Sequence, residues 1–290
     1  MPDRNVRRKA AVIPLLLAIV LAAARCRGRA EPVASLSVEP KDVSLPAGRA
    51  TGWKLTWNPK APLDNLEGKP RVFVHLLASG RNLLRTFDHP LAEVWTPWRA
   101  QSYEIELYQS ALAEPLPAGA YELTAGLYDD ASGERWALDA AGDEVGKREY
   151  RVATVVVPAA EAGTPAYDFG GGWLDAEPGG SKQVLTRQCA RGEATIAVRG
   201  VASPGTVVLG SSVPKLASGS WGGAVDVTAS CSAERAQVNG PELQWARIPV
   251  APAAADPACE IRFTPVPPAA GGKERSVCVE VLAWRPAGGG

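Results

Sequence analysis

The sequence predicts an all-β protein of two β-sandwich domains, and two observations carry this prediction. Between Tyr121 and Tyr128, apolar residues alternate with polar or small ones, which is the period of a strand with one buried face. The turn-forming stretch Asp129–Gly133 follows and Glu134–Leu138 returns as a second strand, so the segment is expected to be a hairpin. No window of the sequence shows sustained helical periodicity, and 29 glycines with 25 prolines suit a chain rich in turns.

The first half contains further strand patterns. Trp53, Leu55 and Trp57 alternate with lysine and threonine, which predicts one packed face and one solvated face. Arg71–Leu77 is apolar on both faces, so it is expected in the middle of a sheet. Tyr150–Val157 is expected to be the last strand of the first domain.

The second half contains short strand patterns at regular spacing, which indicate a sandwich or a barrel. These patterns lie at Gln183–Arg187, Ala194–Val198, Thr206–Leu209, Ala224–Ala229, Leu243–Val250, Cys259–Thr264 and Ser276–Trp284. Pro158–Asp168 has no pattern and is the expected domain boundary. The predicted organisation is a signal peptide at 1–25, a linker at 26–35, a sandwich at 36–157, a linker at 158–168, a sandwich at 169–286 and a tail at 287–290.

Composition narrows the function classes. A chain of 290 residues suggests two domains at about 100–200 residues each, and a hydrophobic fraction of 46% is enough for real cores. The 31 basic residues balance the 31 acidic ones, so the chain has no electrostatic footprint for nucleic acid. We therefore expect no nucleic-acid partner.

The N-terminus has the pattern of an export signal. Basic residues between Arg4 and Lys9 precede the apolar run Ala10–Ala24, which is shorter than the ~20 residues that span a bilayer and is interrupted by Pro14. Export to the periplasm or the outer surface is expected, with membrane contact only through this segment.

The mode of attachment stays open between three alternatives. Ala22–Ala24 fits an ordinary cleavage site, and an uncleaved anchor is the second alternative. In the third, Ala23 to Cys26 resembles a bacterial lipobox in which Cys26 is lipidated, although Arg25 stands where a small residue is usual.

The remaining four cysteines all lie in the second half. They are Cys189, Cys231, Cys259 and Cys278. An even number in an exported domain predicts two disulfides with three possible connectivities, the alternative being buried free thiols. Their spacing has no C-x-x-C cluster, so no metal site is expected.

Neither histidine predicts a catalytic residue. His75 lies in an apolar strand, which favours a hydrogen-bonded histidine in the core. His89 follows Asp88 in a loop, but the sequence places no nucleophile beside the pair, and a Ser-His-Asp arrangement is recognised only in space.

Acidic and glycine-rich loops also have simpler explanations than a cofactor. Asp129, Asp130 and Glu134 could bind Ca²⁺, but the spacing of an EF-hand is missing and the turn explains the acids. Gly170–Gly172 and Gly219–Gly223 lack the Lys-Ser/Thr of a phosphate loop. No cofactor is expected.

Tryptophan is the strongest hint of a ligand, because sugar rings stack on indole. Four of the nine tryptophans fall in expected loops and are the candidate ligand-binding residues: Trp95, Trp98, Trp173 and Trp221. The alternative is that they cover the cores as lids. The tryptophans in strand patterns are expected in the cores: Trp53, Trp57, Trp136, Trp245 and Trp284.

The first half resembles a known module. The match is carried by Val72–Leu77, Gly119–Tyr121, Gly126–Asp129 and Gly133–Arg135. Over Leu36–Val157 the chain resembles a β-sandwich module of bacterial envelope proteins, often the soluble part of membrane glycosyltransferases of the dolichyl-phosphate-mannose type. One departure is Gln101–Ser102 after Trp98, where the module usually has Gly-Glu. The resemblance implies an Ig-like fold.

The second half is similar, more weakly, to the jelly-roll module that often accompanies the first. The match is carried by Gly172–Trp173, Glu177, Gln244–Trp245, Ile248–Val250, Glu274–Arg275 and Val277–Val279. This similarity implies a galactose-binding-like sandwich, in which first and last strands are often neighbours. That neighbourhood favours Cys189–Cys278 with Cys231–Cys259. The transferase chemistry belongs to membrane segments outside the matched motifs and does not carry over.

The sequence therefore predicts a non-catalytic exported envelope protein that binds or scaffolds, with cell-envelope glycan as the hypothetical ligand. Two alternatives remain: a structural or protein-docking component of an envelope assembly, and a hydrolase with paired carboxylates or a triad in a cleft. The expected partner is accordingly an envelope polysaccharide or another envelope protein.

Overall fold

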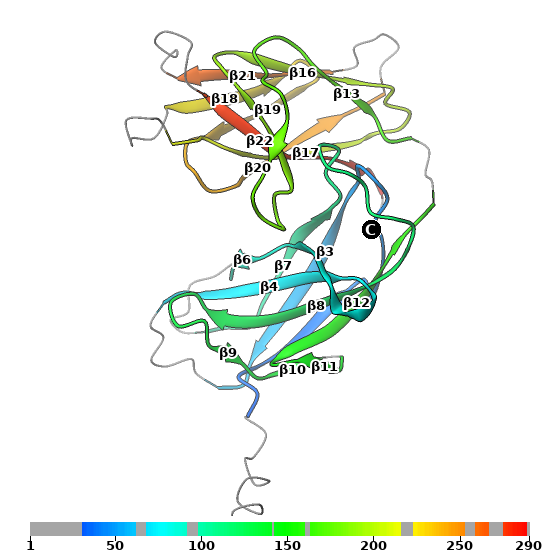
Figure 1. Ribbon diagram of the computed structural model, residues 1–290, viewed down its shortest axis with the longest axis vertical. Helices are drawn as coiled ribbons and strands as arrows, with labels where there is room; N and C mark the ends of the chain where they lie inside the picture. The colour runs from blue at the N-terminus through cyan, green and yellow to red at the C-terminus, as the bar shows by residue number, and fades with distance from the viewer. Residues whose placement is uncertain are drawn as a thin grey trace, which may run out of the picture.

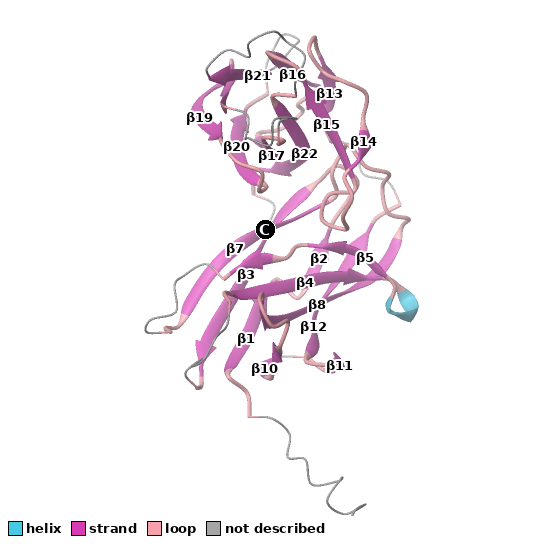
Figure 2. Cartoon of the chain, turned by 60° about the vertical axis from the view of Figure 1, so that its left-hand side comes forward, coloured by secondary structure: helices cyan, strands magenta, loops and turns pink. Residues whose placement is uncertain are grey.

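The computed structural model describes residues 31–61, 68–91, 98–140, 142–159, 163–215, 223–252, 259–266 and 275–288. Apart from one 3-10 turn, η1 (Ser79–Arg81), its regular elements are all strands, so the all-β prediction is confirmed (Figures 1 and 2). Within those ranges no helix is long and apolar enough to cross a membrane. The predicted signal peptide and Cys26 lie outside the described residues.

Two sheets form the first unit. One has the order β10 (Leu138–Ala140), β1 (Ala34–Glu39), β3 (Ala50–Pro59) and β7 (Gln101–Tyr108). The other has the order β11 (Glu144–Gly146), β12 (Glu149–Val157), β8 (Gly119–Asp129), β4 (Pro70–Leu77) and β5 (Leu83–Thr86). Three short strands join this second sheet: β2 (Asp42–Ser44) beside β12, β6 (His89–Pro90) beside β4, and β9 (Arg135–Trp136) beside β8.

The predicted hairpin is confirmed as β8 and β9, which pair Leu127 with Trp136. Its turn uses the acids as expected: Ser132 donates its hydroxyl hydrogen bond to Asp129 at 2.8 Å, and Gly133 adopts a φ of 69°. Gly133 also donates its backbone N–H to the Asp129 carbonyl, so backbone and side chain together close the turn.

The core of the first unit lies between its sheets. Trp53 and Trp57 of β3 are fully buried, as their alternation predicts. The central strand β4 is apolar on both faces, and Val72 and Val74 point into the core. Phe73 on its outer face is covered by the guanidinium of Arg135, which lies 4.2 Å from the ring centroid.

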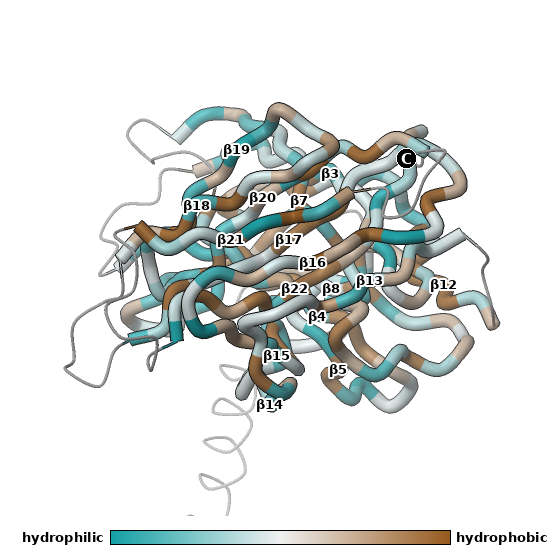
Figure 3. Tube along the Cα trace, turned by 90° about the horizontal axis from the view of Figure 1, so that it is seen from above, coloured by the Kyte–Doolittle hydropathy of each residue, from teal (hydrophilic) through white to brown (hydrophobic). Residues whose placement is uncertain are grey.

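Two five-stranded sheets form the second unit. The first has the order β13 (Ala166–Phe169), β16 (Ala194–Arg199), β21 (Cys259–Val266), β18 (Ala224–Ala229) and β19 (Ser232–Val238). The second has the order β14 (Glu177–Pro178), β15 (Thr186–Ala190), β22 (Val277–Pro286), β17 (Gly205–Ser212) and β20 (Gln244–Val250). Apolar and polar residues alternate along β21, which Figure 3 shows from above.

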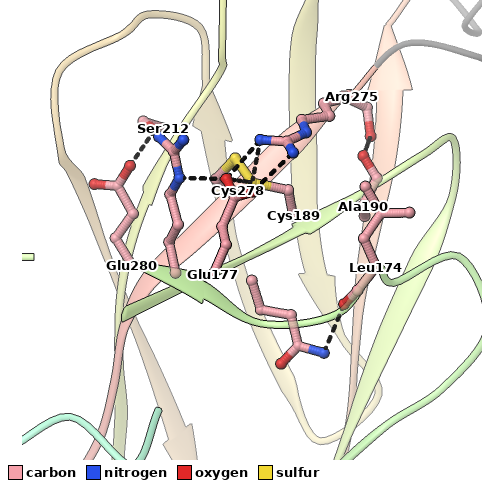
Figure 4. The surroundings of a disulfide bond; sticks show 11 residues. Leu174, Glu177, Cys189, Ala190, Ser212, Arg275, Cys278 and Glu280 are labelled. Atoms are coloured by element: carbon pink, nitrogen blue, oxygen red, sulfur yellow. Dashed lines mark hydrogen bonds and ion pairs between the residues drawn. A yellow bond between two sulfur atoms is a disulfide. The ribbon is translucent and has the colours of Figure 1, made fainter. Parts of the chain in front are cut away.

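Both disulfides form in this second unit. Cys189 of β15 bonds Cys278 of β22, its direct partner in the strand register, and Cys231 bonds Cys259. This is the pairing that the jelly-roll similarity favoured. Beside the first disulfide, Arg275 donates two hydrogen bonds to Glu177 at 2.6 and 2.8 Å (Figure 4). The ion pair ties the loop before β22 to the sheet edge at β14.

The outer face of the β22 sheet packs on the first unit. Val208, Val281 and Ala283 project from this face and belong to the core cluster of the first unit. Backbone bonds join the same surfaces, because Trp284 donates to the Gly48 carbonyl at 2.9 Å and Ala111 donates to the Leu282 carbonyl at 2.7 Å. The two units therefore share apolar packing and main-chain hydrogen bonds.

An ion cluster lies at the same junction. The Glu106 side chain is only 1% exposed, and its Oε1 accepts from Arg247 Nε at 3.0 Å and Arg285 Nη1 at 3.1 Å. The neighbouring Glu104 accepts from Arg285 at 2.7 Å but is 49% exposed. Both arginines come from the second unit, so the buried carboxylate of the first unit requires the second unit to be in place.

We expect Glu106→Ala to lower the free energy of unfolding by about 3 kcal/mol, because two arginines lose a buried partner. Glu104→Ala is the matched control and should cost at most about 1 kcal/mol, since its ion pair is half exposed. Urea denaturation of both variants measures the difference. Equal losses would contradict the view that the junction depends on the buried carboxylate.

Candidate functional site

A cleft of about 460 Å³ lies where the two units meet. The first unit contributes residues of β6 and β7 to its wall, and the second contributes β20 with the loop before it. Gln183, from the loop before β15, completes the boundary and donates a hydrogen bond to the Asp88 carbonyl at 3.3 Å. Neither unit forms this cleft by itself.

Trp245 is the exposed aromatic residue of the cleft. Alternate residues of β20, Ala246 and Ile248, face the core of the second unit, so Trp245 projects from the opposite face. It is 37% exposed, and its ring lies 5.5 Å from that of Tyr108 at an angle of 59°. The expectation that Trp245 lies in a core is therefore wrong, because the second face of this sheet meets the junction.

Tyr108 gives that indole a rigid support. Its ring is buried, lies edge-on to Phe87 at 5.2 Å, and its hydroxyl donates to the Gln183 carbonyl at 3.1 Å. Burial raises the pKa of Tyr108, so the phenol stays neutral. Tyr108 comes from β7 and Trp245 from β20, so the aromatic pair spans the two units.

The tryptophans chosen from the sequence occupy other positions. Trp98 is partly buried and packs against the first core. Trp173 lies edge-on to Phe169 and Phe263 in the second core and donates its indole hydrogen bond to the Thr195 carbonyl at 2.7 Å. Both positions fit the alternative interpretation of lids on a core.

Of the remaining tryptophans, two lie outside the described residues and four lie in or against the first and second cores. The two are Trp95 and Trp221. Trp53, Trp57 and Trp284 are buried, and Trp136 packs partly buried against the first core, as expected.

His89 lines the cleft, but both of its ring nitrogens are engaged. Nδ1 lies 2.9 Å from the Phe87 carbonyl, which can only accept, so Nδ1 carries the proton. Tyr103 therefore donates its hydroxyl to Nε2, also at 2.9 Å. Burial lowers the pKa of His89 to about 4 and raises the pKa of Tyr103. The pair is neutral at neutral pH and holds β6 against β7.

His75 lies on the outer face of β4 and not in the core, so that part of its prediction is wrong. It is satisfied, as predicted, because Nδ1 donates to Glu149 at 3.2 Å, with Asp88 3.8 Å from Nε2. Val72 and Val74 occupy the inner face of β4, which leaves its alternate residues outside.

Glu149 is the centre of that outer cluster. It also accepts from the buried Thr124 hydroxyl at 2.7 Å, and Arg81 and Arg135 each lie 3.5 Å from its Oε2. The hydrogen bond from His75 is the main reason that the pKa of Glu149 falls to about 2. These hydrogen bonds join Glu149 of β12 to Thr124 of β8 and to His75 of β4, so the cluster holds the three strands together.

The charged groups of the cleft differ in how far they are committed. Arg247 is paired with Glu106, whereas Arg71 and Glu242 make no hydrogen bond or ion pair with the residues that the structure describes. Burial raises the pKa of Asp88, which lies near Arg71. Across the described ranges, no group of three or more His, Cys, Asp or Glu residues could hold a metal ion.

Comparison with known proteins identifies no relative by sequence. No family model matches the chain, and no curated protein matches it. One similar solved structure is the M60 catalytic domain with the CBM51-1 and CBM51-2 domains from Clostridium perfringens ZmpB, at 11% identity and a TM-score of 0.31 over 90% of this chain and 32% of that chain. Another is the chicken CNTN1 FN1-FN3 domains, at 9% identity and a TM-score of 0.24 over 87% of this chain and 67% of that one. The chain thus spans about a third of the length of the first structure. Neither TM-score supports an argument about function.

We expect His89 to make the fold sensitive to mild acid. Its folded pKa of about 4 lies below the ordinary histidine value of 6.5, so the folded state resists protonation and stability falls as pH drops from 6.5 towards 4. The loss should be about 2 kcal/mol at pH 5 relative to pH 7.

His89→Gln should remove this dependence, because the amide can still donate to Phe87 and accept from Tyr103. Urea unfolding of both proteins at pH 7 and pH 5 tests the difference. Glu149 does not interfere, since its depressed pKa gives stability that is lost only as pH falls from about 4.5 towards 2. A parallel decline in both proteins would contradict the assignment to His89.

Proposed function

We propose that this protein is an exported, non-catalytic module that binds cell-envelope glycan in the cleft between its two units. The observation that carries the proposal is Trp245, an indole 37% exposed inside a cleft and supported from behind by Tyr108. An exposed aromatic face beside polar side chains matches the apolar C–H face and hydroxyl rim of a sugar ring.

The rest of the cleft supplies what such a ligand needs. Its volume of about 460 Å³ is within the usual range of binding sites, about 300–1,000 Å³. Arg71 offers uncommitted hydrogen-bond donors, and Glu242 offers uncommitted acceptors. Hydroxyl groups can use both at once, because each hydroxyl donates one hydrogen bond and accepts others.

The state of the ionisable groups supports a binding role more than hydrolysis. A hydrolase of sugars needs one carboxyl group as acid and a second as base or nucleophile. In this cleft Glu104 and Glu106 are both paired with arginine, and His89 is neutral with both nitrogens engaged. Asp88 accepts from the Val74 amide, which leaves Glu242 as the one unpaired carboxyl group among the described lining residues, where a pair is needed. The resemblance of the first unit to modules attached to envelope glycosyltransferases agrees with a glycan ligand.

Export is supported by the basic-then-apolar N-terminus and by the two disulfides of the second unit, which are typical of an oxidising compartment. We expect the mature protein, isolated from cell-envelope and culture fractions, to begin at residue 25 or at a lipidated Cys26, and an intact N-terminus in the membrane fraction would indicate the uncleaved anchor. Intact mass spectrometry with N-terminal peptide mapping decides between them. Recovery of all the protein in the cytosol with residues 1–24 intact would refute export.

We expect Trp245→Ala to weaken binding to envelope polysaccharide about tenfold, because the stacking surface is lost while both cores remain intact. Val266→Ala is the matched control, since Val266 is an exposed apolar residue of β21 outside the cleft. Glycan arrays followed by calorimetry on the best ligand measure both. Absence of sugar binding, with stable capture of an envelope protein instead, would favour the protein-docking alternative.

A further inference from the structure

Resting on the proposed glycan-binding function, we infer that the cleft selects uncharged sugars and discriminates against sugars that bear carboxylate or phosphate groups. The inference comes from the ion pairs of Glu104 and Glu106 with two arginines, and from the excess of carboxylates over guanidinium groups around the aromatic platform. It names a ligand class for the same cleft and does not require another site.

In the inner part of the cleft the charges of the acidic and basic side chains cancel. Glu104 and Glu106 lie within hydrogen-bonding distance of Arg285, and Glu106 also accepts from Arg247. Two carboxylates therefore face two guanidinium groups. Glu106 is 1% exposed and fixed by the packing of the junction, so it keeps its arginines when a ligand enters. The charges of this part of the cleft therefore cancel, and they give an acidic ligand little electrostatic attraction.

Arg71 is the cation that remains, but it does not face the cleft alone. Asp88 lines the same cleft and lies near enough to interact electrostatically with Arg71. Asp88 is fixed there, because its carboxylate accepts from the Val74 amide at 3.0 Å. An incoming carboxylate would share Arg71 with an anion already present, and this reduces the gain from the new contact.

Glu242 makes the net charge around the cleft negative. It is exposed in the loop before β20, three residues before Trp245, and makes no ion pair with another described residue. The histidine and tyrosine side chains add no compensating charge, since His89 and Tyr103 are both neutral at neutral pH. The cleft therefore has more carboxylates than guanidinium groups, even when Arg285, which pairs with Glu106 without lining the cleft, is included. The four carboxylates are those of Asp88, Glu104, Glu106 and Glu242, and the three guanidinium groups are those of Arg71, Arg247 and Arg285.

Hydroxyl groups meet no such obstacle. A sugar hydroxyl can accept from Arg71 and donate to Glu242 without displacing any existing ion pair. The face of the ring remains free to stack on Trp245. The cleft can thus hydrogen-bond neutral hydroxyl groups, whereas added negative charge at the same place weakens binding.

The experiment uses pairs of polysaccharides that differ only in charge. Polygalacturonate, polymannuronate and hyaluronan are each compared with their own carboxyl-reduced derivative, by calorimetry with the full mature chain at low and at physiological salt. In every pair that binds, the reduced polymer is expected to bind at least fivefold more tightly, and the gap should shrink at higher salt because the repulsion is screened.

Two variants locate the effect. Glu242→Gln removes one negative charge and should raise the affinity for each acidic polymer about threefold relative to its own carboxyl-reduced derivative. Glu234→Gln, which changes an exposed acid on β19, should leave that ratio unchanged. Tighter or equal binding of the acidic members, still lost in Trp245→Ala, would overturn the selectivity while preserving the glycan-binding function. Failure of all six polymers and of the glycan array would overturn both.

Discussion

The packing of one sheet face against a neighbouring unit is the constraint on which the rest of the structure depends. Val208, Val281 and Ala283 are completely buried and reach from the second unit into the core of the first. Burial of this apolar surface fixes the orientation of the units, and the enclosed Glu106 carboxylate adds a directional requirement because it must keep its arginines. The cleft exists because that orientation brings Tyr108 and Trp245 together.

The parts of the fold that follow from local periodicity could be predicted from the sequence. Trp53 and Trp57 alternate with polar residues and are buried, and the turn after β8 closes through Asp129 and Gly133 as its chemistry requires. The strand β19 escaped prediction because Ser232–Val238 is largely exposed and lacks an apolar face. Periodicity finds a strand only when one of its faces is buried.

The candidate site could not be predicted in the same way, since its residues meet only in the folded chain. His89 and Tyr103 belong to different sheets, and the Glu106–Arg247 pair is separated by 141 residues. The alternation in β20 correctly divides its residues between two faces, but it does not reveal which face meets another unit. The strand pattern therefore places Trp245 in a core, and the loop pattern selects Trp95, Trp98, Trp173 and Trp221 as candidates instead.

The shared junction also has an evolutionary consequence. Val208, Val281 and Ala283 complete the interior of the first unit. A recombination event that moved the second unit alone would therefore expose the apolar outer face of its β22 sheet to water. The isolated second unit would tend to aggregate. The two units are therefore expected to be inherited together, with co-varying positions on the two sides of the junction.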